Sequence, residues 1–264
     1  MKFVIDNSLK DFLLDVIKEC MEYVLTLKTF KVESKFDGSP VTDADKKIDK
    51  IIQKNLSSRY PYIPVVSEEK DLNKGAFLTD RYWLIDPIDG TKSFAKNGTG
   101  YTINIAMIHQ GNPILGFIAH PPSNTVWYGF KGKTFVLNNN VERQIQVSQY
   151  DVYNMRIVAS QNYDLKTKEF LNKIKNIQIE HFSSSIKFCK LAEGKADLYA
   201  RLNSISKWDI AAGDAILRSA GGITLNEQGA EIKYNTSSTE TGIFFAVSSK
   251  TIWNELILSR LNGI

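Results

Sequence analysis

Residues 82–91 read Tyr-Trp-Leu-Ile-Asp-Pro-Ile-Asp-Gly-Thr, four apolar residues followed by two carboxylates three positions apart. The apolar run predicts a short buried strand that ends before Asp86. Acidic residues at the carboxyl end of a strand, here Asp86 and Asp89, lie where α/β proteins usually place their sites. Gly90 permits a positive φ and a close approach of backbone N–H groups to an anion, and Thr91 adds a hydroxyl. The stretch therefore predicts oxygen ligands for a hard cation beside amides for a phosphate.

The same letters also fit an ordinary surface turn, because Asp, Pro and Gly all favour turns. Two other acidic positions favour the functional interpretation. Glu68 follows the apolar pair Val65-Val66, and Asp209 stands at an expected helix start after a strand. Each has a plain alternative, a solvated loop acid for Glu68 and a helix N-cap for Asp209. Because three such acids are less expected to converge by accident than any one of them, a shared site is predicted.

Away from this stretch, hydrophobic spacing predicts a layered α/β chain. Helices are expected over residues 8–28 and 43–58, and a strand over 63–66. Hairpins are expected from residues 102–109 with 114–120 and from 124–130 with 134–137. After about residue 155, strands (156–159, 178–181, 198–202, 244–247) alternate with helices (165–174, 184–194, 209–220, 253–261). We therefore predict an N-terminal α+β domain, residues 1–155, and a C-terminal α/β domain, residues 156–264.

Composition is that of a globular protein, with 43% hydrophobic and 23% charged residues in 264. The net charge of +4 is made of scattered lysines, without the basic block typical of a nucleic-acid protein, so no nucleic-acid partner is expected. The only two cysteines, Cys20 and Cys189, lie far apart among apolar residues and are expected to be buried, reduced thiols. No apolar run reaches signal or membrane-spanning length, so a cytoplasmic protein without a transmembrane segment is expected.

Clustered carboxylates repel one another and need cations or raised pKa values. Oxygen ligands suit Mg²⁺, with Mn²⁺ as an alternative, and the lack of a Cys/His cluster argues against zinc. The three histidines, His109, His120 and His181, lie outside these motifs, so a histidine nucleophile is not expected. The expected nucleophile is a water activated by a cation, and a second cation about 4 Å away would stabilise the leaving oxygen.

Four segments together resemble the inositol monophosphatase family of lithium-sensitive phosphatases: residues 37–45 (Asp-Gly-Ser-Pro-Val-Thr-Asp-Ala-Asp), 67–69, 86–91 and 208–213. The resemblance implies a layered αβαβα fold. It implies two or three Mg²⁺ ions held by Glu68, Asp86, Asp89, Asp209 and the Ile88 carbonyl. It also implies catalytic roles for Asp45, Thr91 and Glu68, the first two orienting the attacking water.

Two later segments are similar to the 3′(2′),5′-bisphosphate nucleotidase branch of this family, Ser183 to Cys189 and Leu198 to Leu202. Ser184 and Lys187 are expected three residues apart on one face of a helix N-terminus that points at an anion. Arg201 can add a bidentate contact to a second phosphate. The alternative is that Lys187 and Arg201 are ordinary solvated charges.

The resemblance thus implies hydrolysis of 3′-phosphoadenosine 5′-phosphate to AMP and phosphate. The residues expected to contact the substrate are Glu68, Ile88, Asp89, Gly90, Thr91, Ser184, Lys187, Arg201 and Asp209. Inositol monophosphate or fructose 1,6-bisphosphate is the alternative substrate, and an RNA-binding regulatory protein on the same fold is the distant alternative. The partner expected is a nucleotide bisphosphate, and the chain is expected to be a monomer or a homodimer. A peripheral position on the cytoplasmic face of the inner membrane is an alternative to a purely cytoplasmic one.

Overall fold

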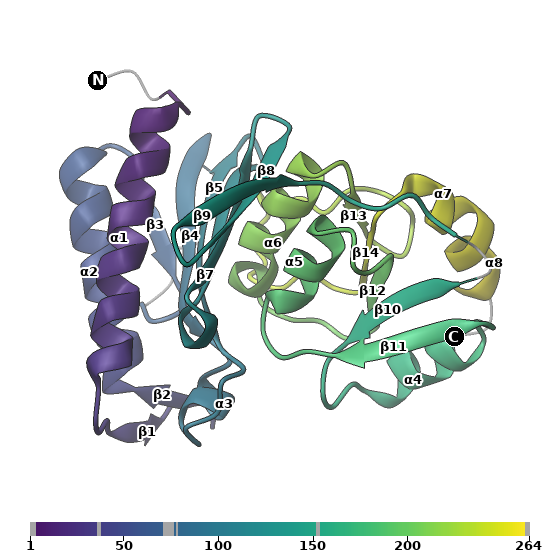
Figure 1. Cartoon of the computed structure of the whole chain (residues 1–264), viewed down its shortest axis with the longest axis horizontal. Helices are drawn as coiled ribbons and strands as arrows, with labels where there is room; N and C mark the ends of the chain where they lie inside the picture. The colour runs from purple at the N-terminus through teal and green to yellow at the C-terminus, as the bar shows by residue number, and fades with distance from the viewer. Residues whose placement is uncertain (1–3, 36–37, 71–76, 78, 152–153, 262–264) are drawn as a thin grey trace.

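The computed structural model describes residues 4–35, 38–70, 77, 79–151 and 154–261 (Figure 1). Its helices are α1 (Asn7–Thr26), α2 (Asp43–Arg59), α3 (Thr91–Phe94), α4 (Leu165–Asn172), α5 (Ile186–Ala192), α6 (Lys207–Ser219), α7 (Lys250–Ile252) and α8 (Leu258–Leu261), with short turns η2 (Pro121–Ser123) and η3 (Trp253–Ile257). Its strands are β1 (Val32–Ser34), β2 (Pro40–Thr42), β3 (Val65–Ser67), β4 (Arg81–Asp89), β5 (Thr102–His109), β6 (Asn112–His120), β7 (Thr125–Phe130), β8 (Lys133–Asn138), β9 (Val141–Ile145), β10 (Met155–Ala159), β11 (Ile177–His181), β12 (Leu198–Arg201), β13 (Ile223–Leu225) and β14 (Phe244–Val247).

The elements form five layers, which confirms the predicted αβαβα arrangement (Figure 1). Helices α1 and α2 cover one face of a seven-stranded sheet, ordered β3-β4-β5-β6-β7-β8-β9. Helices α5 and α6 lie between this sheet and a five-stranded sheet, ordered β11-β10-β12-β14-β13. Helix α4 and the C-terminal helices cover the outer face of the smaller sheet.

Strand β4 is buried on both faces, because successive side chains of a strand point in opposite directions. Trp83 and Ile85 pack with α1 and α2, whereas Tyr82 and Leu84 pack toward α6. This double burial explains why the sequence there is an unbroken apolar run.

The predicted end of this strand before Asp86 is wrong, because β4 continues to Asp89. Asp86 pairs with Asn104 and Asp89 pairs with Thr102, so three steps along β4 match two steps along β5. Pro87 lies in this irregular part of the ladder, where its missing N–H costs least. In a regular strand, residues three apart would point to opposite faces, but the extra residue of a bulge restores a common side for the two carboxylates.

Several other predictions need correction at the element level. β9 was not predicted, because all but its last residue are exposed, and the three-residue β13 was also missed. Helix α5 begins at Ile186 instead of residue 184. The C-terminal helix is interrupted by the π-helical turn η3.

The large sheet ends at β9 and the small sheet begins at β10, close to the predicted boundary at residue 155. One hydrophobic cluster nevertheless joins both sheets through α5 and α6. The two-domain division therefore stays a prediction. Within the described ranges, no helix combines the length and the apolar character that crossing a bilayer requires.

Candidate active site

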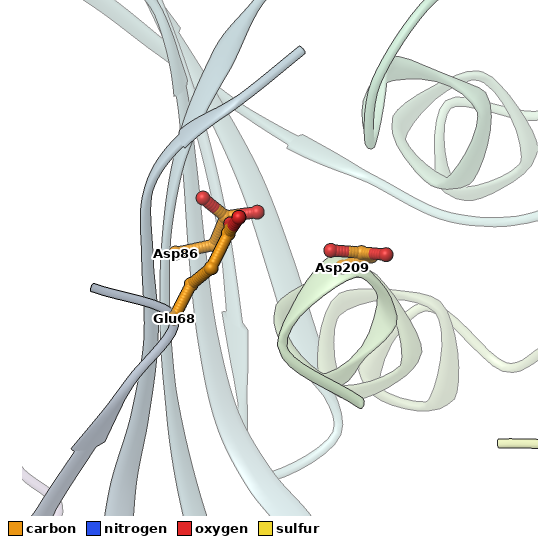
Figure 2. A group of neighbouring side chains, drawn as sticks. All are labelled: Glu68, Asp86 and Asp209. Carbon is orange, nitrogen blue, oxygen red and sulfur yellow. The ribbon is translucent and has the colours of Figure 1, made fainter. Parts of the chain in front are cut away.

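A cavity of about 210 Å³ lies where the carboxyl end of β4 meets the N-terminus of α6. It is lined by Ser39, Pro40, Glu68, Asp86, Ile88, Asp89, Gly90, Thr91, Lys92 and Asp209. Carboxylate oxygens of Glu68, Asp86 and Asp209 all lie within 4.8 Å of one another. Figure 2 shows Asp209 on α6 facing the pair contributed by the sheet side. The structure thus brings together three predicted acids, and the fourth, Asp89, lines the same cavity.

Asp86 is 1% exposed, and neither of its carboxylate oxygens has a hydrogen-bond partner among the described residues. Its pKa is raised well above the ordinary value by burial and, next, by the charges of Glu68, Asp89 and Asp209. A buried carboxylate without hydrogen bonds is costly unless a cation neutralises it. The orphaned oxygens and the all-oxygen donor set therefore fit a hard divalent cation such as Mg²⁺.

Asp209 lies in the first turn of α6, where its carboxylate accepts a hydrogen bond from the Ser206 backbone N–H at 3.2 Å. Ser206, and not Asp209, occupies the N-cap position, so the simple N-cap alternative is wrong. Burial raises the pKa of Asp209 well above the ordinary value, Asp89 and Glu68 raise it further, and Arg201 opposes them. The helix start fixes this acid so that it faces the sheet.

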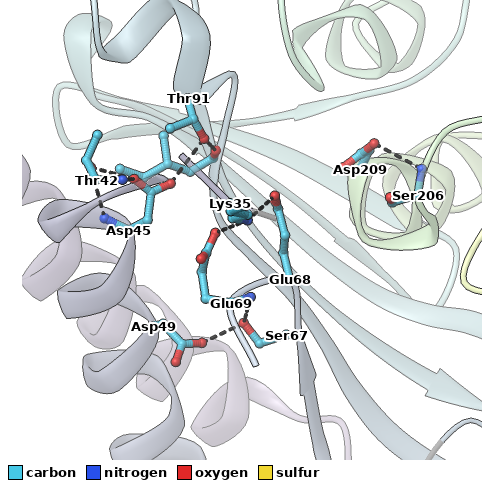
Figure 3. A network of polar contacts seen from close by, with 11 residues as sticks. Lys35, Thr42, Asp45, Asp49, Ser67, Glu68, Glu69, Thr91, Ser206 and Asp209 are labelled. Carbon is cyan, nitrogen blue, oxygen red and sulfur yellow. Dashed lines mark hydrogen bonds and ion pairs between the residues drawn. The ribbon is translucent and has the colours of Figure 1, made fainter. Parts of the chain in front are cut away.

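Asp45 and Thr91, paired in the sequence only through the family resemblance, lie in direct contact (Figure 3). Asp45 is held at the start of α2 by the Thr42 backbone N–H, which donates to its Oδ2 at 2.8 Å. The Thr91 hydroxyl lies 3.1 Å from Asp45 Oδ1 and 2.9 Å from the Ile88 carbonyl oxygen. It has one proton and can donate to only one of the two at a time. Burial raises the pKa of Asp45, although its hydrogen bonds lower it.

Gly90 connects β4 to α3 with a φ of +97°, which favours glycine. A Cβ at this position would lie 2.5 Å from the carbonyl oxygen of Gly100. The bend that directs Thr91 toward Asp45 therefore requires glycine for two separate reasons.

Lys35 is a site residue that the sequence analysis missed. Its ammonium lies 2.7 Å from Glu68 Oε1 and 2.7 Å from Glu69 Oε1 (Figure 3). Burial alone would lower the pKa of Lys35, but its bonds to Glu68 and Glu69 raise it. The pKa of Glu69 is raised to about 7, chiefly by burial, with Lys35 acting in the opposite direction. The sequence could not predict this contact, because Lys35 is a single lysine that belongs to no periodic pattern or motif.

The residues predicted to bind a second phosphate are arranged differently from the expectation. Ser184 has a φ of +51° and precedes α5, so the helical face that it was expected to share with Lys187 is wrong. The Lys187 ammonium is buried and donates to the carbonyl oxygens of Phe182 at 3.2 Å and Ser184 at 2.5 Å. Arg201 ends β12, and its Nε has no hydrogen-bond partner among the described residues. Substrate roles for these three residues stay predictions.

None of the three histidines is among the described residues that line the carboxylate cavity. His120 and His181 instead line a separate, larger cavity of about 1080 Å³. Cys20 and Cys189 are buried and unpaired, as predicted.

The sequence profile of the inositol monophosphatase family matches residues 6–261 of the chain. The chain is 38% identical over 223 residues to the 3′(2′),5′-bisphosphate nucleotidase CysQ of Escherichia coli K12, covering 84% of this chain and 90% of that protein. The crystal structure of CysQ from Bacteroides thetaiotaomicron superposes with a TM-score of 0.79 at 25% identity, covering 92% of this chain and 98% of the other. The magnesium and phosphate complex of an IMPase/NADP phosphatase shares the fold, with a TM-score of 0.82 at 19% identity over 98% of this chain and 96% of the other.

Proposed function

The chain belongs to the inositol monophosphatase family, and from this premise we propose that it is a magnesium-dependent phosphatase that hydrolyses 3′-phosphoadenosine 5′-phosphate to AMP and phosphate. The single observation that carries the phosphatase chemistry is the convergence of the Glu68, Asp86 and Asp209 carboxylates, with both buried Asp86 oxygens lacking a hydrogen-bond partner among the described residues. The choice of a nucleotide bisphosphate is supported by the relatives named as bisphosphate nucleotidases.

Glu68, Asp86, Asp89, Asp209 and the Ile88 carbonyl would hold two or three Mg²⁺ ions, with Mn²⁺ as a substitute. Bound divalent cations lower the pKa of water and offset the negative charge of the transferring phosphoryl group. Because the cavity exposes acids from the sheet and from α6, the phosphate would be held between the two.

Asp45 and Thr91 would orient the attacking water. When the Thr91 hydroxyl donates to the Ile88 carbonyl, Asp45 Oδ1 is free to accept a proton from that water. Burial makes Asp45 a better proton acceptor than an ordinary aspartate, because its pKa is raised. The new bond joins the water oxygen to the 3′-phosphorus, the bond to the 3′-oxygen breaks, and the leaving oxygen takes a proton from solvent.

Arg201 would hold the 5′-phosphate, with Ser184 and Lys187 shaping the turn beside it. A guanidinium offers a paired set of donors that matches a phosphate. Binding the 5′-phosphate, which does not react, would orient the 3′-phosphate, which does. The protein would act in the cytoplasm as a monomer or a homodimer.

A phosphate-release panel tests this function. We expect Mg²⁺-dependent release from 3′-phosphoadenosine 5′-phosphate with a kcat/KM at least about tenfold above that on inositol 1-phosphate, which lacks a second phosphate, because a charged hydrogen bond to that phosphate contributes about 1.5–3 kcal/mol. Release from fructose 1,6-bisphosphate should also be slower. Equal or faster release from either rival would replace the substrate. If no substrate gives Mg²⁺-dependent release while salt-sensitive RNA binding survives EDTA and Asp89→Asn, the distant alternative would stand instead.

A further inference from the structure

Ser185 occupies the N-cap position of α5 and is 2% exposed. A serine at this position usually accepts a hydrogen bond from a backbone N–H in the first turn of the helix. The Ser185 side chain makes no such bond. Its hydroxyl lies instead 2.7 Å from Asp89 Oδ2, 2.8 Å from the backbone oxygen of Asp209 and 2.8 Å from Asn104 Nδ2.

Proton counting decides how this hydroxyl is used. The Asn104 amide nitrogen can only donate, so the Ser185 oxygen accepts there and has one proton left to give. An ionised carboxylate is a stronger acceptor than a backbone carbonyl, which favours donation to Asp89 Oδ2. Asn104 Nδ2 and Thr102 Oγ1 also approach this same oxygen, at 3.4 and 3.5 Å. The donors of the described residues therefore gather on Oδ2 and leave Oδ1 of Asp89 for the cavity.

The contact also joins two layers of the fold. Asp89 and Asn104 lie on β4 and β5 of the large sheet, whereas Ser185 lies at the start of α5 in the middle helical layer. The turn that carries Ser185 is itself held in place by a hydrogen bond, because the Lys187 ammonium donates to the Ser184 carbonyl at 2.5 Å. One buried hydroxyl thus links the middle helical layer to the strand that provides Asp86 and Asp89.

We propose that Ser185 is a positioning residue for the phosphatase site: its hydroxyl fixes the orientation of Asp89 and holds that carboxylate against the middle helical layer, which also provides Asp209. Residues that hydrogen-bond to metal ligands set ligand orientation, and their loss weakens metal binding about 10- to 100-fold. The inference rests on the proposed function, because it takes Asp89 as a ligand of the divalent cation.

Titration calorimetry of Mg²⁺, with Mn²⁺ as a second probe, into the metal-free full chain tests this role without substrate. Ser185→Ala should raise the Kd about 10- to 100-fold. Ser185→Cys keeps a side chain of similar shape, slightly larger, with only a weak donor and should raise the Kd similarly. Ser248→Ala is the matched control, because the Ser248 hydroxyl is also buried but has no hydrogen-bond partner among the described residues. Its Kd should equal that of the wild type.

Melting in EDTA shows whether each variant folds, and if Ser185→Ala does not fold, Ser185→Cys decides. A Kd within about twofold of wild type, less than about 0.5 kcal/mol, in a folded Ser185 variant would overturn the positioning role while leaving the proposed function intact. A wild-type chain that binds neither ion would overturn the proposed function and this role with it.

Discussion

Asp86 has the most demanding environment of any residue in the cavity. It is buried on β4, its oxygens have no hydrogen-bond partner among the described residues, and after burial the charges of four other carboxylates raise its pKa. The Lys35 ammonium does not offset this charge, because it bonds to Glu68 and Glu69. The residue therefore makes physical sense as a ligand and not as a structural acid.

Neutralising Asp86 should separate metal binding from stability. We expect Asp86→Asn to abolish the rise in Tm that Mg²⁺ gives and to lower kcat/KM at least about a thousandfold, since cations supply several kcal/mol of charge stabilisation. The Tm in EDTA should not fall, because the variant removes an uncompensated buried charge.

Asp197→Asn is the matched control for this change. Asp197 is equally buried but is paired with Arg156 at 2.8 Å. Its neutralisation should lower the Tm and leave Mg²⁺ binding intact. The account of Asp86 is contradicted if Asp86→Asn melts lower in EDTA and still responds to Mg²⁺.

Arg201→Ala tests the second-phosphate contact. We expect kcat/KM on 3′-phosphoadenosine 5′-phosphate to fall about 10- to 100-fold, the cost of one charge-assisted hydrogen bond. Activity on 3′-AMP, which lacks the 5′-phosphate, should change little and serves as the internal control. Equal losses on both substrates would show that Arg201 acts through Asp209 and not through the substrate.

At the residue scale, the sequence predicted the acids because each follows an apolar run or begins a helix. It could not predict Lys35 or Ser185, because one lysine and one serine make no periodic pattern. Their contacts depend on how β3, β5 and α5 meet in space.

At the element scale, the bulge of β4 matters most. The sequence predicted that the strand ends before Asp86, where Asp, Pro and Gly favour a turn, but tertiary pairing with β5 extends the strand to Asp89. The result is a rigid strand that presents both acids. The β9 strand escaped prediction because an exposed edge strand has no apolar alternation.

Lys35 follows β1 directly, and its ammonium would compete with a bound cation for Glu68. Lys35→Ala should lower the Kd for Mg²⁺ about two- to fivefold, a modest effect because partly exposed ion pairs contribute up to about 1 kcal/mol. Lys46→Ala is the control, since Lys46 pairs with the exposed Glu33. Calorimetry decides, and weaker binding in Lys35→Ala would mean that Lys35 orients Glu68 instead of competing for it.

At the scale of the whole molecule, the site lies between layers. The large sheet provides Asp86 and Asp89, and the middle helical layer provides Asp209. Strand and helix periodicity predicted the alternating elements, but the five-layer order came from the family resemblance. Periodicity describes which face of an element is buried and not which other element covers it.

The acids should give the metal-free protein a pH-dependent stability. The folded pKa values of Asp86 and Asp209 are raised well above the ordinary value of 3.8. At a pH between the unfolded and the folded pKa of each acid, the folded state therefore binds more protons than the unfolded state. The free energy of unfolding therefore falls as pH rises. Glu69 adds to this fall between 4.5 and about 7.

We expect the Tm in EDTA to decrease from about pH 5 to pH 7.5, and Mg²⁺ to raise the Tm more at the higher pH, since the cation binds the ionised acids. Asp86→Asn should show a shallower decrease. Calorimetric scans at several pH values check this, and a Tm in EDTA that rises over this range would be inconsistent with buried, mutually repelling acids.

The most direct measurement is an anomalous diffraction map from crystals soaked with Mn²⁺, AMP and phosphate. We expect manganese peaks coordinated by Glu68, Asp86, Asp89 and Asp209, with the phosphate on the same ions and the AMP phosphate near Arg201. Manganese bound elsewhere, with no peak between these four carboxylates, would contradict it.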